Sequence, residues 1–379
     1  MRVLLVSKIL VVAAYRGKLD ALATRPEIDR LLVVTPPEWQ EPRGRTLGLE
    51  PGGGARAYDL RVEPIWFNGR YHLFLWPRLG RVMREFKPDL VHIDEEPYNL
   101  ATAHGTWLAE RIGARSLFFT WQNLLRRYPP PFKWFERSVF QHSAYAIAGS
   151  TEALGVLHRK GYRGPGCVIP QFGVDPELFA PGPPSPHDPP VIGFIARLVE
   201  EKGLLVLLQA LRDLPGPWRL HVIGSGPLES RARRRAAQLG LAERITWERG
   251  VPSRLVPERL RTFTLLVQPS LTRPHWKEQF GRAVMEAMAC GVPVVGSDSA
   301  EIPNVIGDAG LVVREGDPLA LRSAIATLLG DRELRETLAE RGRARVLRYY
   351  THERIAEQTV GAYRAALGEA LAAAGATIS

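Results

Sequence analysis

Short apolar runs rich in β-branched residues alternate along the chain with segments in which apolar residues recur at helical spacing. This alternation is typical of parallel sheets whose strands are joined by crossover helices. In the first half, the pattern predicts strands at residues 3–6, 30–35, 90–93, 116–120 and 144–148. In the second half, it predicts strands at residues 191–196, 219–223, 245–247, 264–268 and 292–295. An α/β fold is therefore expected.

Two long segments rich in proline and glycine interrupt this pattern. Residues 36–62 are expected to form a surface loop, in which the EPGGGAR stretch at 50–56 mimics a phosphate loop but neither follows a strand nor opens a helix. Residues 173–190 hold seven prolines without any periodicity and are expected to link two domains. From about residue 332 onward the pattern predicts helix.

Composition agrees with two soluble globular domains. The 379 residues are too many for one ordinary core, and 45% of them are apolar and 24% charged. No apolar run approaches the roughly 20 residues of a membrane-spanning helix, and Lys8 interrupts the apolar start, which is expected to be a buried strand rather than a signal peptide. Two cysteines, Cys167 and Cys290, cannot form a disulfide framework, so a reducing, cytoplasmic setting is expected.

The net charge of +10 is unevenly spread. Residues 1–175 hold 24 Lys and Arg against 17 Asp and Glu, whereas residues 176–379 hold 26 against 23. A basic first half suits an anionic partner such as a phospholipid surface, a lipid diphosphate or a nucleic acid. The sequence contains no recognisable nucleic-acid-binding module, so nucleic acid is not expected as a partner.

The segment WKEQFGRAVMEAMACGVPVVGSD at 276–298 carries the clearest chemistry. Two glutamates, Glu278 and Glu286, flank Phe280 and Gly281, which are expected to open a helix. The N-terminus of a helix exposes backbone N–H groups and a positive dipole end, so it can hold a phosphate without a basic side chain. Glu278 would lie beside one end of the anion and Glu286 beside a hydroxyl group at the other. A diphosphate with a sugar at each end fits this layout.

Two cations are expected to face the same ligand. The string GFIARLVEEKGLLVLLQAL, from Gly193, predicts a strand, a short loop holding Arg197 and Lys202, and a helix. Ligands of open parallel sheets bind at the carboxyl ends of the strands, where this loop begins. The guanidinium group and the ammonium group are therefore placed to neutralise a leaving diphosphate.

The 276–298 segment resembles the E-x7-E signature of retaining glycosyltransferases of family 4, and the G-x-x-x-R-L-x-x-x-K-G arrangement around Arg197 and Lys202 is similar to the pattern of the same family. The resemblance implies the GT-B fold: two Rossmann-like parallel-sheet domains that face each other across a cleft, with a C-terminal helix crossing back to the first. It implies an acceptor-binding domain at 1–172, a linker at 173–190, a donor-binding domain at 191–350 and the returning helix at 351–379.

The resemblance also implies roles for individual residues. Arg197 and Lys202 would stabilise the departing diphosphate, and Glu278 would bind hydroxyl groups of the donor sugar. No D-x-D motif is present, so neither a metal nor another cofactor is expected. The remaining donor-binding positions are Gly224 and Gly226 near the nucleotide, the backbone of Gly250 and Val251 at the base, the N–H groups of Gln279, Phe280 and Gly281 at the sugar and distal phosphate, and Glu286 at the ribose.

The first half departs from the family's pattern in two places. Ala13 and Ala14 follow the first strand where many members have two glycines, and Gln122 in FFTWQN takes the place of a histidine in a setting like TWH. Glutamine can hydrogen-bond a hydroxyl group but cannot take its proton. Ala14, Tyr15, Gln122 and the strand-ending Asp94 are expected to contact the acceptor or the sugar.

The segment RRYPPPFKWFER at 126–137 interleaves cations with aromatic residues. Such a segment can lie at a lipid interface, but it can equally be an ordinary loop and helix whose aromatic side chains belong to the core. A lipid-linked acceptor would favour the first interpretation.

The leading hypothesis is a retaining hexosyltransferase that uses a nucleotide-diphosphate sugar and a hydroxyl acceptor, lipid-linked or polysaccharide, for surface polysaccharide or glycolipid synthesis at the cytoplasmic face of a membrane. A non-catalytic nucleotide-sugar-binding protein is an alternative, because the histidine is replaced and the glycine pair is absent. A sugar-nucleotide 2-epimerase is another, although such enzymes need acid–base side chains in the cleft.

Overall fold

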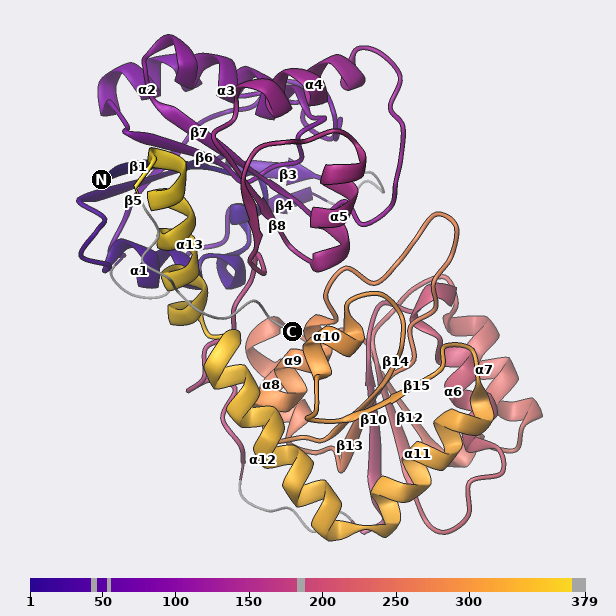
Figure 1. Cartoon of the computed structure of the whole chain (residues 1–379). Helices are drawn as coiled ribbons and strands as arrows, with labels where there is room; N and C mark the ends of the chain where they lie inside the picture. Colours follow the sequence, from indigo (N-terminus) through magenta and orange to yellow (C-terminus); the bar gives the residue numbers. More distant parts are fainter. Residues whose placement is uncertain (42–45, 53–55, 183–187, 370–379) are drawn as a thin grey trace. The chain divides into compact units, whose positions relative to one another are not determined.

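The computed structural model describes residues 1–41, 46–52, 56–182 and 188–369, which form two compact units (Figure 1). The first unit contains residues 1–173 together with the last helix, α13 (His352–Leu367). The second contains residues 174–351. The middle residues of the EPGGGAR stretch lie outside the described residues.

The sheet of the first unit consists of parallel strands in the order β5-β2-β1-β6-β7-β8-β9. Its side chains alternate between two helical layers, as the strand period of two requires. Val3 and Leu5 pack into one layer, and Leu4 and Val6 into the other. The strands are β1 (Arg2–Val6), β2 (Arg30–Thr35), β5 (Asp59–Val62), β6 (Leu90–Ile93), β7 (Arg115–Thr120), β8 (Tyr145–Ala148) and β9 (Gly166–Val168).

Helices cover both faces of this sheet (Figure 1). The face of Val3 and Leu5 carries α1 (Gly17–Ala23) and α13. The opposite face carries α2 (Leu79–Phe86), α3 (Leu100–Arg111), α4 (Phe132–His142) and α5 (Thr151–Arg159).

The helix α13 belongs to the core of the first unit although it comes last in the chain. Ile355, Val360 and Tyr363 are buried there beside Leu5 and Leu19, and α13 contacts α1 and strands β6 to β8. The predicted return of the C-terminal helix to the first domain is confirmed. The physical reason is that α13 has an apolar face, which is buried against α1 and the sheet of the first unit.

The sheet of the second unit has parallel strands in the order β12-β11-β10-β13-β14-β15. They are β10 (Val191–Ile195), β11 (Arg219–Ile223), β12 (Ile245–Glu248), β13 (Leu265–Gln268), β14 (Val294–Ser297) and β15 (Leu311–Val313). The helices are α6 (Leu204–Leu211), α7 (Glu229–Gln238), α8 (Val256–Leu260), α9 (Arg282–Ala289), α10 (Ile302–Ile306), α11 (Pro318–Gly330) and α12 (Arg332–Tyr349). The expected pair of Rossmann-like parallel-sheet domains is thus confirmed.

The segment at 36–62 was predicted incorrectly as one surface loop. It contains an antiparallel pair, β3 (Glu38–Gln40) and β4 (Thr46–Gly48), and it ends in β5, the edge strand of the sheet. Trp39 and Tyr58 within it are buried. The proline, glycine and arginine content hid these short strands, because each contributes only one or two apolar side chains to the core.

The proline-rich segment after Gly173 is bound to the second unit. Arg343 of α12 donates hydrogen bonds to the carbonyl oxygens of Pro176 and Phe179, at 2.8 and 2.7 Å. Arg261 donates to those of Leu178 and Ala180, both at 2.8 Å. These arginines supply donors to a backbone that forms no ladder of its own.

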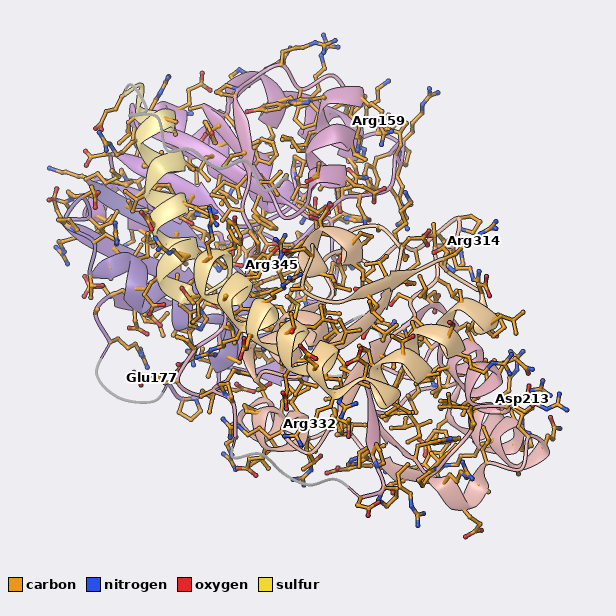
Figure 2. The ribbon with its side chains drawn as sticks, turned by 60° about the horizontal axis from the view of Figure 1, so that its bottom comes forward. Arg159, Glu177, Asp213, Arg314, Arg332 and Arg345 are labelled. Atoms are coloured by element: carbon orange, nitrogen blue, oxygen red, sulfur yellow. The ribbon has the colours of Figure 1, made fainter. Side chains whose placement is uncertain are left out.

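Arginine side chains such as Arg159, Arg314 and Arg332 extend from the ribbon into solvent (Figure 2). Among the described helices, none is both long and apolar enough to cross a membrane.

Candidate active site

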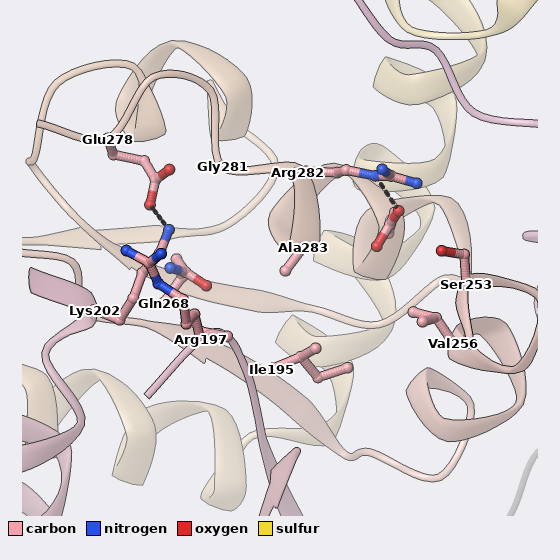
Figure 3. A pocket seen from close by; sticks show the side chains of 12 residues that line it. Ile195, Arg197, Lys202, Ser253, Val256, Gln268, Glu278, Gly281, Arg282 and Ala283 are labelled. Atoms are coloured by element: carbon pink, nitrogen blue, oxygen red, sulfur yellow. Dashed lines mark hydrogen bonds and ion pairs between the residues drawn. The ribbon is translucent and has the colours of Figure 1, made fainter. Parts of the chain in front are cut away.

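A cavity of about 280 Å³ lies at the carboxyl edge of the second unit's sheet (Figure 3). Its lining comes from the ends of β10 and β13, the loop that leads into α6, the start of α8 and the start of α9. Five residues expected in the donor site line it: Arg197, Lys202, Glu278, Gly281 and Glu286. Ile195, Ala196, Ser253, Val256, Gln268, Arg282 and Ala283 complete the lining.

The helix α9 begins at the cavity wall. Gly281 precedes its first residue and has φ +84°, a left-handed conformation that glycine adopts without strain. No side chain caps this helix end. Gly281, Arg282 and Ala283 all line the cavity, so the positive end of the helix dipole opens onto it.

Glu278 and Lys202 form an ion pair at one end of the cavity. Nζ of Lys202 lies 2.5 Å from Oε2 of Glu278, and Oγ of Ser270 donates to the same oxygen at 3.0 Å. Glu278 is 7% exposed, so this carboxylate is held in one orientation inside the wall.

Arg197 lies beside this pair and is exposed. Its guanidinium group and the ammonium group of Lys202 occupy the same end of the cavity (Figure 3). Within the described part of the chain, no acidic side chain pairs with Arg197. Two neighbouring cations, only one of which is paired with a carboxylate, leave an excess of positive charge that suits an anionic ligand.

Glu286 also lines the cavity and is paired with Arg282, which lies on the side away from Lys202 and Glu278 (Figure 3). Glu286 is 8% exposed. Arg282 lies one helical turn before it on α9, and Nε of Arg282 donates to Oε1 of Glu286 at 2.6 Å. Burial raises the pKa of Glu286, and Arg282 opposes that shift. The two glutamates therefore line one cavity, with the start of α9 between them.

Two polar residues at the end of β13 complete the site and were not predicted. Gln268 lines the cavity and donates through Nε2 to Oγ of Ser270 at 2.9 Å. Both are buried. The signal that could have found them is their position: polar residues at the carboxyl end of an otherwise apolar strand, on either side of Pro269.

Four donor-binding residues expected from the sequence do not line the cavity. A side chain on Gly224 or Gly226 would come within 1.9 Å of the carbonyl oxygen of Ala196 or 2.3 Å of that of Leu198. These glycines let the loop after β11 pack against the loop that holds Arg197. Gly250 and Val251 lie in the segment between β12 and α8. The residues of this segment and of the start of α8 that line the cavity are Ser253 and Val256, which come later in the chain. The contact of the four expected residues with a nucleotide stays a prediction.

Gln279 and Phe280 also lie just outside the lining. The Gln279 side chain is exposed, whereas Phe280 is buried against Tyr350 with ring centroids 5.6 Å apart. Phe280 therefore anchors the turn before α9 to the core.

In the first unit, Ala14 and Tyr15 form a short 3₁₀ turn after β1. Ala14 is exposed, and the ring of Tyr15 lies 4.3 Å from that of Phe172, centroid to centroid. The N–H group of Ala13 donates to the carboxylate of Glu50 at 2.8 Å. The Glu50 carboxylate thus binds the turn in which this chain has Ala13 and Ala14 instead of two glycines.

Asp94 is buried within the first unit, with no exposed side-chain surface. Nε2 of Gln171 donates to its Oδ1 at 3.0 Å, and Oε1 of Gln171 accepts from the indole of Trp121 at 2.6 Å. Nζ of Lys18 lies 3.8 Å from Oδ2, and burial lowers the pKa of nearby His92 to about 4. The surroundings of Asp94 are therefore protein side chains.

Gln122 is held at both ends of its amide. Oε1 accepts from Nζ of Lys160 at 2.9 Å, and Nε2 donates to the hydroxyl of Tyr128 at 3.1 Å. Lys160 also pairs with the buried Glu136. Burial lowers the pKa of Lys160 and raises that of Glu136, and their mutual attraction opposes both shifts. Gln122 thus belongs to a network with Lys160, Tyr128 and Glu136.

Among the described residues, no cluster of three or more His, Cys, Asp or Glu side chains is arranged to hold a metal ion.

Two solved structures have the same fold over nearly the whole chain. Sucrose-phosphate synthase from Thermosynechococcus elongatus aligns with a TM-score of 0.72 and 19% identity, covering 96% of this chain and 98% of that one. Anabaena HepE in complex with UDP aligns with a TM-score of 0.72 and 18% identity, covering 95% and 98%.

The sequence is also similar to curated glycosyltransferases. A GDP-mannose-dependent phosphatidylinositol monomannoside mannosyltransferase of Mycolicibacterium smegmatis is 33% identical over 186 residues, which cover 44% of this chain and 49% of that protein. A 2-deoxystreptamine N-acetylglucosaminyltransferase of Streptomyces fradiae is 25% identical over 315 residues, covering 76% and 73%. The chain spans about half the length of the first curated relatives it matches.

Family models match both units. The model for glycosyltransferase family 4 matches residues 29–178, and the model for glycosyl transferases group 1 matches residues 177–345. The chain therefore belongs to the group 1 glycosyltransferases of family 4 and has their GT-B fold.

Proposed function

We propose that this protein is a retaining glycosyltransferase that moves a hexose from a nucleotide-diphosphate sugar to a hydroxyl group of an acceptor. The observation that carries the proposal is the cavity with Arg197 and Lys202 at one end, the Arg282–Glu286 pair at the other and the start of α9 between them. A diphosphate with a sugar at each end matches this distribution of charge. The similar mannosyltransferase named for GDP-mannose and the complex of Anabaena HepE with UDP-glucose support this donor class.

Arg197 and Lys202 would stabilise the leaving diphosphate. The ammonium group of Lys202 has three N–H donors, so it can keep its bond to Glu278 and still bind a phosphate oxygen. Negative charge builds on the diphosphate as the bond to the sugar breaks, and donors already in place stabilise that charge without reorganisation. Glu278 would bind hydroxyl groups of the transferred hexose, and Glu286 those of the ribose.

Retention would follow from a front-face reaction in which the leaving phosphate oxygen takes the proton of the acceptor hydroxyl. Lys202 and Ser270 both bind Oε2 of Glu278, an arrangement that suits a binding carboxylate better than a nucleophile. The two cations would do the work of a metal ion, so activity is expected to persist in EDTA. A requirement for Mg²⁺ or Mn²⁺ would contradict this part of the proposal.

The first unit would bind the acceptor, a lipid-linked or polysaccharide hydroxyl compound, at the cytoplasmic face of a membrane. An exposed group of side chains at the start of α4 supports a lipid surface as partner: Trp134 is 64% exposed and Leu125 is 56% exposed. Tyr128 and Phe132 of the same segment instead pack against His72. We call the exposed group the apolar–basic surface; its members are Leu125, Arg126, Arg127, Lys133, Trp134 and Arg137.

One calorimetric series tests the donor class. Free UDP, GDP and ADP are titrated into the full chain first, followed by the glucose and mannose conjugates of whichever nucleotide binds. Binding of one nucleoside diphosphate is expected, with Glu286→Ala weakening it by about tenfold through loss of the ribose contact. If none of the nucleotides binds, the proposal fails.

A non-catalytic nucleotide-sugar-binding protein remains the second candidate. The observation that favours it is Gln122, whose amide is bonded by Lys160 and Tyr128 and cannot transfer a proton. Slow hydrolysis of a bound donor that Glu278→Ala abolishes would exclude this candidate.

A further inference from the structure

The side chain of Gln268 has an unusual position at the end of β13. It is 2% exposed, lines the cavity and bonds through Nε2 to Ser270. Its Oε1 is buried and has no hydrogen-bond partner among the residues that the structure describes. A buried polar oxygen without a partner has lost its hydrogen bonds to water without replacing them, so such an atom at a cavity indicates that a ligand supplies the missing donor.

The neighbouring hydrogen bonds fix which end of the amide is left without a partner. A carboxylate only accepts hydrogen bonds, so Ser270 must use its single hydroxyl proton to bind Oε2 of Glu278. Its oxygen must then accept from Gln268, and only the amide nitrogen can donate. Oε1 is therefore the amide atom that Ser270 leaves without a partner. Figure 3 shows the Gln268 side chain at the cavity wall with its oxygen turned toward the interior.

The chemistry of the missing partner follows from this orientation. An amide oxygen only accepts, and so do the oxygens of an ionised diphosphate, so a phosphate cannot satisfy Oε1. The partner must carry an O–H or N–H group. Within a nucleotide-diphosphate sugar, the groups of this kind at the Glu278 end of the cavity are the hydroxyls of the transferred hexose.

We propose that Oε1 of Gln268 accepts a hydrogen bond from one hydroxyl group of the transferred sugar and so helps to select that sugar. Ser270 joins Gln268 to Glu278, so the two acceptors form one surface that recognises sugar hydroxyls next to the phosphate-binding cations. This inference rests on the proposed function. It adds a specificity residue that neither the two glutamates nor the two cations supply.

The experiment compares two variants of the full chain by calorimetry. Gln268→Met has a similar volume but lacks both polar atoms, whereas Gln268→Glu keeps an acceptor oxygen and replaces the amide donor with a second, negatively charged oxygen. Each protein is titrated with UDP and UDP-glucose, and with GDP and GDP-mannose. The quantity compared is the ratio of the Kd of the free nucleotide to that of its sugar conjugate, in which general effects on the phosphate contacts cancel.

The ratio is expected to fall about tenfold in Gln268→Met, corresponding to one hydrogen bond, and to stay within about threefold of the wild-type value in Gln268→Glu. Unchanged binding of the free nucleotide shows that Gln268→Met is folded. If this variant does not fold, Gln268→Leu is used instead. A donor whose sugar lacks the hydroxyl group that binds Oε1 is expected to bind the wild type about tenfold more weakly than the parent donor does. In Gln268→Met the deoxy donor and the parent donor should bind equally well.

A wild-type ratio in Gln268→Met would overturn the inference and leave the proposed function intact. If the wild-type protein binds neither nucleotide, the proposed function fails, and the role of Gln268 fails with it. A fall in the ratio of equal size in both variants would assign Gln268 the task of holding Ser270 and would likewise overturn its contact with the sugar.

Discussion

Nζ of Lys202 lies 2.5 Å from Oε2 of Glu278, and this bond joins the loop after β10 to the segment before α9. The Glu278 side chain is 9% exposed and that of Lys202 is 20% exposed, so water screens the pair less than it would an ion pair on the surface. Lys202 therefore has a structural partner as well as a proposed ligand. Arg197, which is exposed, has no acidic partner among the residues that the structure describes.

This difference separates the two cations experimentally. Arg197→Ala and Lys202→Met are each expected to lower turnover by about a hundredfold or more, because each removes a charge that would stabilise the leaving diphosphate. Lys202→Met should also lower the free energy of unfolding by about 1–3 kcal/mol, since it leaves Glu278 without its cation. Arg197→Ala should change it by less than about 0.5 kcal/mol.

Initial rates with the nucleotide sugar and thermal melts check both expectations. Arg234→Ala, an exposed arginine on α7, is the matched control and should change neither quantity. If Arg197→Ala turned over as fast as Arg234→Ala, the role of Arg197 would be wrong.

The sequence predicted those parts of the fold and site that depend on local patterns. Apolar runs placed β2, β6 and β11 to the residue, because each is a mostly buried strand whose apolar side chains form one continuous or nearly continuous run. The E-x7-E spacing and the Arg197 loop predicted residues that line one cavity, since the loop and the segment before α9 follow the carboxyl ends of β10 and β13. Strand β14 begins at Val294 rather than at Val292, because Pro293 cannot donate to a ladder.

What the sequence did not predict depends on contacts between distant residues. The relay from Gln268 through Ser270 to Glu278 requires the end of β13 to meet the segment before α9. Gln122 is fixed by Lys160, which lies 38 positions later and is not part of any motif. The short strand β5 was missed because pairing with β2, rather than its own composition, defines it. No periodicity in the sequence encodes such pairings.

The apolar–basic surface predicts membrane binding that combines apolar and electrostatic contributions. The full chain is expected to sediment with vesicles containing phosphatidylglycerol and to bind phosphatidylcholine vesicles much more weakly, with salt reducing the difference. Trp134→Ser together with Leu125→Ser should weaken binding by about tenfold, because two exposed apolar side chains are lost from the interface. Leu319→Ser, at a 65% exposed leucine of α11, is the control. Equal binding by both proteins would exclude this surface as the contact.

The return of α13 to the first unit predicts a stability effect within that unit. A hydrogen bond of 2.8 Å joins the Tyr363 hydroxyl to Nδ1 of His92, and both side chains are buried. Tyr363→Phe should lower the free energy of unfolding by about 1–3 kcal/mol, because it leaves a buried ring nitrogen without that bond. The double variant with His92→Leu should be less destabilised than the sum of the single variants. Additive effects in melting experiments would show that the bond contributes nothing.

Glu96, at the carboxyl end of β6, predicts how stability depends on pH. Burial raises its pKa from 4.5 to about 7, although Oγ1 of Thr120 and the N–H group of Trp121 donate to its carboxylate at 2.6 and 2.8 Å. The folded state therefore binds this proton more tightly than the unfolded state, and the contribution of Glu96 to stability falls as the pH rises from about 4.5 to about 7. Above pH 7 that contribution is constant.

Glu96→Gln removes this titration. Relative to wild type, the free energy of unfolding of the variant should rise between pH 5 and pH 7 by up to about 3 kcal/mol and then level off. The amide has one acceptor oxygen for two donors, which adds a constant cost of about 1 kcal/mol at every pH, so the slope decides the test and not the absolute value. Denaturation of the full chain at several pH values measures it, with the exposed Glu110→Gln of α3 as control. Parallel pH profiles for wild type and Glu96→Gln would contradict the raised pKa.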